Sequence, residues 1–173
     1  MKTQTILEPM ATRVALHPFL AGMQPRQLAL LTDCAMVVRF AAGQVIFREG
    51  ELANRFYLIE SGRVVLESNR RLAKPVVIDS VEAGDLLGWS WMFPPHAWHF
   101  TAHATKPTVA IFFQGRILRE YCERDQALGY ELFKRMSAVM VKRLQAARLK
   151  MLAIDSKRTA LPPAIEALLP EPR

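Results

Sequence analysis

Cysteine is scarce in this chain of 173 residues, where Cys34 and Cys122 are the only two. Two thiols are too few for a disulfide scaffold, a four-thiolate zinc site or an iron–sulfur cluster held by four cysteines. We therefore expect both to be reduced thiols in a cytoplasmic protein.

Long apolar segments are also missing. The longest apolar runs, such as 109–113, fall far below the roughly 18 residues of a membrane-helix candidate. Glu8, Arg13, His17 and Pro18 interrupt the N-terminal region in which a signal peptide would need an apolar core. These absences predict a soluble protein with no membrane partner.

Common catalytic and phosphate-binding motifs are absent as well. The chain contains no GxxxxGK[ST], GxGxxG, GxSxG or HExxH sequence. We therefore expect a protein that is not an enzyme. An enzymatic function stays open as an alternative, because the chain has a barrel-like strand pattern and three histidines close together.

Short β-type runs separated by glycine fill the middle of the chain. These runs are 36–40, 45–48, 55–60, 63–68, 76–81, 98–105 and 109–114. The glycines between them supply the positive φ that tight turns need. Many short strands at this spacing indicate a sandwich or barrel, so the expected fold class is mainly β with flanking helices.

Helical periodicity brackets the strands. Pro25 opens a helix within an N-terminal helical segment, 1–35, and Asp125 can cap a long helix that follows a short one at 116–124. We expect a β-roll over 36–114, C-terminal helices over 115–154 and a proline-containing tail over 155–173.

The long helix carries a repeat with alternating gaps of four and three residues. Its members are Phe133, Ser137, Met140, Leu144, Ala147, Met151 and Ile154. A period of about 3.5 residues, held for about three heptads, predicts a coiled-coil seam and hence a homodimer. A helix packed on its own barrel is the alternative.

The stretch 43–64 reads GQVIFREGELANRFYLIESGRV, and 84–88 reads GDLLG. Together with the strand, short helix and long helix that end the chain, this closely resembles the cyclic nucleotide-binding domain of the Crp/Fnr (catabolite activator) regulators, over about residues 14–154. The resemblance implies a double-stranded β-helix, a jelly-roll or cupin-like β-roll, with an internal ligand pocket and a long C-terminal dimerisation helix. It implies a regulatory, ligand-sensing role. We expect the tail to hold no helix-turn-helix DNA-binding domain of the kind that family regulators carry.

The pocket that this resemblance implies departs from the family pattern. Ligand-binding members use a Gly-Glu pair for the ribose and an Arg-Ser/Thr-Ala triplet for the cyclic phosphate. Here Trp89 follows Gly88, the arginine position falls on Trp98, His99 or Phe100, and no Lys or Arg lies between Lys74 and Lys106. A buried phosphate needs charge-assisted donors, so we expect neither cAMP nor cGMP to bind in the usual manner and predict no certain cofactor. The candidate pocket residues are Gly88, Trp89, Ser90, Trp91, Trp98, His99, Phe100, Thr101 and Ala102.

Aromatic side chains replace the charged anchors, and three interpretations stay open. The aromatics fill the pocket and leave a degenerate, non-binding dimerisation module; they bind a small apolar or aromatic ligand; or they belong to a degenerate nucleotide site.

Three histidines accompany the aromatics. His96, His99 and His103 are candidate metal ligands, with His99, Thr101 and His103 on one face of a strand. No nearby carboxylate or cysteine completes a set, so we predict no metal.

The formal net charge of +7 is concentrated in one segment. Residues 132–158 contain eight Lys and Arg against Asp155 alone, and eight minus one equals the whole excess. A solvated helix flank, an acidic protein partner or a nucleic acid contacted by this helix would each account for it. We expect the domain to act through protein contacts, and the nucleic-acid alternative stays open.

Overall fold

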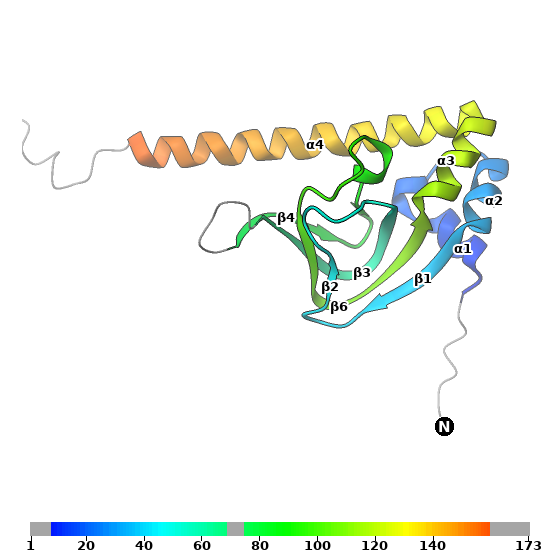
Figure 1. Cartoon of the computed structure of the whole chain (residues 1–173), viewed down its shortest axis with the longest axis horizontal. Helices are drawn as coiled ribbons and strands as arrows, with labels where there is room; N and C mark the ends of the chain where they lie inside the picture. The colour runs from blue at the N-terminus through cyan, green and yellow to red at the C-terminus, as the bar shows by residue number, and fades with distance from the viewer. Residues whose placement is uncertain (1–7, 69–74, 160–173) are drawn as a thin grey trace, which may run out of the picture. The chain divides into compact units, whose positions relative to one another are not determined.

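The computed structural model describes residues 8–68 and 75–159, with side chains as far as Ile154. The chain divides into two compact units between Arg135 and Met136, and each unit is described by itself. The first contains an antiparallel sheet and short helices that gather at one end of the strands (Figure 1). This confirms the predicted fold class, a mainly β roll with flanking helices.

Short helices precede and follow the sheet. They are α1 (Met10–Leu16), the 3-10 helix η1 (Pro18–Leu20), α2 (Pro25–Asp33) and α3 (Gly115–Arg124). Pro25 occupies the first turn of α2, as predicted, where its missing N–H costs no hydrogen bond. The Gln27 side chain accepts a hydrogen bond from the Gln24 N–H at 3.1 Å and so caps the same turn.

Six strands build the sheet. They are β1 (Ala35–Phe40), β2 (Val45–Phe47), β3 (Arg55–Ser68), β4 (Val76–Glu82), β5 (Leu86–Leu87) and β6 (Thr101–Gln114). The order is β1-β6-β3-β4, with β2 also paired to β6 and β5 to β3, and every pairing is antiparallel. The two long strands, β3 and β6, therefore form the centre of the roll.

Each long strand replaces two predicted shorter ones. The runs 55–60 and 63–68 join in β3, because Gly62 continues the strand through a register irregularity instead of ending it. Gly62 has φ +97°, and a Cβ there would lie 2.4 Å from Thr108 Oγ1 of β6. Glycine is needed at this close approach of two backbones.

The long helix α4 (Gln126–Thr159) crosses the boundary between the units. Asp125 caps it as predicted, since its Oδ1 accepts a hydrogen bond from the Leu128 N–H at 3.1 Å. The tail was predicted to begin at 155, which is wrong, because α4 continues to Thr159. After Gly129 near the start of the helix, no proline or glycine occurs before Pro162 to stop it. The remainder of the predicted tail, 160–173, lies outside the described residues.

Aromatic side chains form the core between β3, β6 and the segment that follows β5. Phe56 stacks on Phe113 with ring centroids 4.6 Å apart and on Trp91 at 5.6 Å. All three are almost fully buried. Burial of such large apolar surfaces supplies much of the driving force for folding and holds the following segment against the sheet.

Candidate functional site

The predicted pocket residues all lie in one connection, residues 88–102, which we call the cassette segment. It leaves β5 at Gly88, forms the 3-10 helix η2 (Ser90–Met92) and enters β6 at Thr101. Backbone hydrogen bonds join it to the turn before β3. The Trp98 N–H donates to Glu51 O at 2.9 Å, and the Gly50 N–H donates to Trp98 O at 2.8 Å.

The predicted strand 98–105 therefore begins too early. Trp98 pairs with the turn at Gly50 and Glu51, so the ladder of β6 begins only at Thr101. His99 lies outside the strand, and the expected shared face of His99, Thr101 and His103 does not form.

Trp98 covers the start of the cassette segment. Its indole is 4% exposed and stacks on Phe47 of β2, with ring centroids 3.8 Å apart and planes 12° apart. Gly88 has φ +84°, and a Cβ on it would lie 2.8 Å from the Trp98 ring. The Trp98 indole thus occupies the space directly beside Gly88, the last glycine of the GDLLG sequence at 84–88.

The other two tryptophans have different surroundings. Trp91 belongs to the core through its stack on Phe56, and its Nε1 has no hydrogen-bond partner in the part of the chain that is described. Trp89 is only half-buried and stacks on His99 at 5.5 Å. The expected aromatic cluster is therefore divided between the core and a partly exposed pair.

The polar side chains among the predicted pocket residues already have partners within the protein. Ser90 Oγ lies 3.0 Å from His99 Nδ1, and Thr101 Oγ1 accepts a hydrogen bond from the Glu49 N–H at 3.1 Å. Ala102 is fully buried and Phe100 half-buried. A ligand that bonds to Ser90 or Thr101 would have to displace these internal bonds, which raises the cost of binding.

The histidines are dispersed among separate contacts. His96 Nδ1 lies 3.0 Å from the Trp91 carbonyl oxygen, and His103 Nδ1 lies 3.6 Å from Glu67 Oε2. Within residues 8–68 and 75–159, no three His, Cys, Asp or Glu side chains gather as a metal-binding set.

Both cysteines are unpaired thiols. Burial raises the pKa of Cys34 and of Cys122 to about 11. Both thiols therefore stay protonated at neutral pH, which makes them poor nucleophiles and poor metal ligands.

One guanidinium reaches the cassette segment from elsewhere in the chain. Arg119 of α3 donates from Nη1 to the Trp91 carbonyl oxygen at 3.1 Å. No sequence pattern predicts this contact, because the two residues are 28 positions apart and no local motif links them.

A cavity of about 250 Å³ opens beside this contact. It is lined by Trp91, Met92, Arg119, Cys122, Glu123, Gly129 and Phe133. Phe133, assigned to the dimer seam, meets Phe93 edge to face at 6.4 Å. The first residue of the predicted seam therefore contacts its own chain.

The rest of the predicted seam lies in the second unit and differs in exposure. Ser137 and Met140 are half-buried, whereas Leu144 and Met151 are each 70% exposed and Ala147 and Ile154 are also exposed.

No helix in the part of the chain described here has the length and apolar content to span a bilayer.

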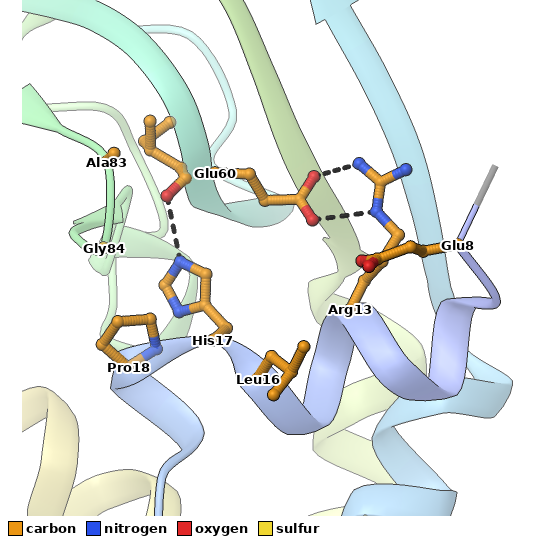
Figure 2. A pocket seen from close by; sticks show the side chains of 9 residues that line it. Glu8, Arg13, Leu16, His17, Pro18, Glu60, Ala83 and Gly84 are labelled. Atoms are coloured by element: carbon orange, nitrogen blue, oxygen red, sulfur yellow. Dashed lines mark hydrogen bonds and ion pairs between the residues drawn. The ribbon is translucent and has the colours of Figure 1, made fainter. Parts of the chain in front are cut away.

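A second cavity, of about 300 Å³, lies where α1 and η1 meet β3 (Figure 2). Arg13 and Glu60 form a bidentate ion pair at one side, with Arg13 Nε 2.8 Å from Glu60 Oε1. At the other side, His17 Nε2 lies 3.0 Å from Ile59 O, and the Phe19 N–H donates to His17 Nδ1 at 3.2 Å. These contacts attach the N-terminal helices to the roll.

His17 should make the fold sensitive to mild acid. Burial lowers the pKa of its imidazole below the ordinary 6.5, because the charged ring loses its solvation. The hydrogen bond that Nδ1 accepts from the Phe19 N–H also needs an unprotonated Nδ1. The unfolded chain takes up the proton near pH 6.5, whereas the folded chain does so only at lower pH. The free energy of unfolding should therefore decrease from pH 6.5 down to the lowered pKa, by at most about 1.4 kcal/mol per pH unit.

Urea denaturation between pH 7.5 and 5 would measure this slope. In His17→Asn, the amide oxygen can still accept the Phe19 N–H bond but does not titrate, so the slope should become smaller. Parallel pH profiles for the two proteins would rule out His17 as the source.

Comparisons with known proteins agree with this geometry. The family model described as "Cyclic nucleotide-binding domain" matches residues 37–125. The crystal structure of a putative cyclic nucleotide-binding protein from Geobacter metallireducens is 30% identical, with a TM-score of 0.68, over 80% of this chain and 99% of that one. The catabolite activator protein of Thermus thermophilus shares the fold, with a TM-score of 0.64 and 20% identity over 80% of this chain and 63% of that one.

Curated relatives match over a shorter stretch. The cAMP-dependent protein kinase regulatory subunit of Schizosaccharomyces pombe is 32% identical over 71 residues, which are 41% of this chain and 16% of the relative. The chain spans only 11–25% of the length of the curated relatives that it matches, two kinase regulatory subunits and an acetyltransferase. The glycine-bounded roll, the cassette segment and the matched residues together establish that the chain belongs to the cyclic nucleotide-binding domain family.

Proposed function

We propose that this chain is a regulatory domain that has lost the usual cyclic nucleotide site and acts as a homodimer through contacts with a partner protein, not by catalysis. The single observation that carries the proposal is the Trp98 indole, stacked on Phe47 at 3.8 Å and pressed against Gly88. A protein side chain fills the space beside the motif glycine.

The charge of the cassette segment supports the same conclusion. No Lys or Arg lies between Lys74 and Lys106. The Arg119 guanidinium, which reaches this segment from α3, is already bonded to the Trp91 carbonyl oxygen. Each lost charged hydrogen bond to a phosphate is worth roughly 1.5–3 kcal/mol, so losing two weakens binding by orders of magnitude.

Thermal denaturation with added nucleotide tests this proposal. We expect cAMP and cGMP at about 1 mM to raise the Tm by less than about 1 °C, because a ligand far below its Kd stabilises little by mass action. The acyclic 5′-AMP serves as the control for non-specific effects. Saturable stabilisation by cAMP, absent with 5′-AMP, would contradict the proposal.

The homodimer rests on the exposed seam residues of α4. Leu144 and Met151 leave most of their apolar surface in water in a single chain. Pairing of two such helices would bury this apolar surface.

We also propose a cytoplasmic location, which the two unpaired cysteines favour.

A second candidate function is the sensing of a small apolar or aromatic ligand. The specific observation in its favour is the cavity of about 250 Å³ beside η2, whose walls include Trp91, Met92 and Phe133. Apolar cavities of about 150 Å³ admit a benzene-sized molecule, so this one has room for a small aromatic ligand. Native mass spectrometry of the purified protein would detect a retained ligand, and a mass equal to the bare chain or its dimer would count against this candidate.

A further inference from the structure

The second unit exposes more apolar surface than one coiled-coil seam can cover. Apart from the seam, Val141, Leu149 and Leu152 of α4 are 53%, 66% and 56% exposed. Successive residues of a helix are about 100° apart, so these three side chains centre about 120° around the axis from the predicted seam. A two-stranded coiled coil would leave them in water.

These side chains form a stripe with a defined border. Ala138, Val141, Gln145, Leu149 and Leu152 follow one another at helical spacing and make up what we call the second face. Arg148 lies along one edge and Lys142 along the other, and both are exposed. The second face is therefore an apolar stripe between two cations.

The charge around the second face determines what can cover it. Residues 132–154 contain six Lys and Arg and no Asp or Glu. A second copy of the second face would bring its own Lys142 and Arg148 against the same two cations, and no carboxylate borders this face to offset them. A nucleic acid would place phosphates over Val141, Leu149 and Leu152, whose side chains offer no hydrogen bonds.

We propose that the second face binds an acidic amphipathic helix of a partner protein. This rests on the proposed function, in which the domain acts through protein contacts, and it names the surface and the chemistry of the partner. Leucine-like side chains of the partner pack on Val141, Leu149 and Leu152, and its flanking carboxylates pair with Lys142 and Arg148. Coiled-coil pairing of two helices uses this combination of apolar anchors and charged borders.

Fluorescence anisotropy with a labelled probe peptide tests the proposal on the full chain. The probe is a helical peptide of about three heptads with leucine on one face and glutamate on both borders. We expect saturable binding that weakens at least about tenfold when the salt concentration rises from about 0.05 M to 0.5 M. The same peptide with lysine in place of glutamate should not bind.

Two variants locate the binding to the second face. We expect the triple variant Val141→Ser, Leu149→Ser and Leu152→Ser, and the double variant Lys142→Glu and Arg148→Glu, each to weaken probe binding at least about tenfold. Leu16→Ser removes a side chain that is also 70% exposed, but on α1, and should leave binding unchanged. Light scattering should report the same dimer for all of them.

The remaining outcomes overturn the proposal. Failure of the probe to bind a dimeric wild-type chain overturns the second face as an acidic-helix site while leaving the dimer and the lost nucleotide site intact. Dissociation of the triple variant would assign this face to self-association. If the probe does not bind, the chain is tested against anionic vesicles and duplex DNA. Binding to either one that both variants lose would assign the second face to a membrane or to a nucleic acid.

Discussion

Replacing both Leu144 and Met151 with lysine is expected to convert the proposed homodimer into monomers. Both side chains are 70% exposed in a single chain and lie on the predicted seam, so their burial depends on the partner helix. Burying one such side chain is worth roughly 1.5–3 kcal/mol, and the double variant removes four of them from a dimer. Lysine also adds cations to a helix segment, 132–154, that has no carboxylate.

We expect the dimer Kd to rise by at least about 100-fold, which corresponds to about 2.7 kcal/mol. Sedimentation equilibrium over a wide protein concentration range measures it. Val141→Lys with Leu149→Lys makes the same change of charge on the second face and should leave the dimer intact. If the two double variants dissociate equally, or neither dissociates, the seam is assigned to the wrong face of α4.

Replacing Trp98 with alanine should cause a large loss of stability, about 3–5 kcal/mol. The indole is almost fully buried and stacks on Phe47, so its removal leaves an apolar cavity as well as losing its burial. Urea denaturation measures the loss. Trp89→Ala is the matched control, because Trp89 is half-buried, and should cost less than about 1.5 kcal/mol.

The same variant tests whether the cassette segment can accept a flat apolar molecule. An apolar cavity that stays dry binds small aromatic compounds. Indole at millimolar concentration should therefore raise the Tm of Trp98→Ala by mass action and leave that of the wild type almost unchanged. Equal Tm shifts in both proteins would show that indole binds elsewhere. In the urea experiment, a decrease in the free energy of unfolding of less than about 1 kcal/mol for Trp98→Ala would mean that Trp98 does not fill the site.

The local features of the fold followed from short sequence signals. Pro25 and Asp125 begin their helices as predicted, because a proline at the first turn and a carboxylate at an N-cap act over three or four residues. The glycine pattern predicted the turns, but its prediction that Gly62 separates two strands is wrong, because Gly62 lies inside β3. Its positive φ was readable from the sequence, whereas the approach of Thr108 that requires it was not.

Errors at the ends of elements came from competing partners. Trp98 carries a strand-forming side chain, and propensity alone extends β6 back to it. Its backbone instead pairs with Glu51 and Gly50, which the sequence does not bring near. At the other end of the chain, α4 continues past Ile154 because nothing before Pro162 stops it.

The sequence by itself determined the family, the mainly β architecture and the absence of a cation between Lys74 and Lys106, because each depends only on residue identity and spacing. Only the tertiary structure decided which side chains meet across the fold. It brought Phe47 onto Trp98, Arg119 to the Trp91 carbonyl oxygen and Arg13 to Glu60. Such contacts join residues far apart in the chain, and close packing of the whole core selects them, so no local pattern contains them.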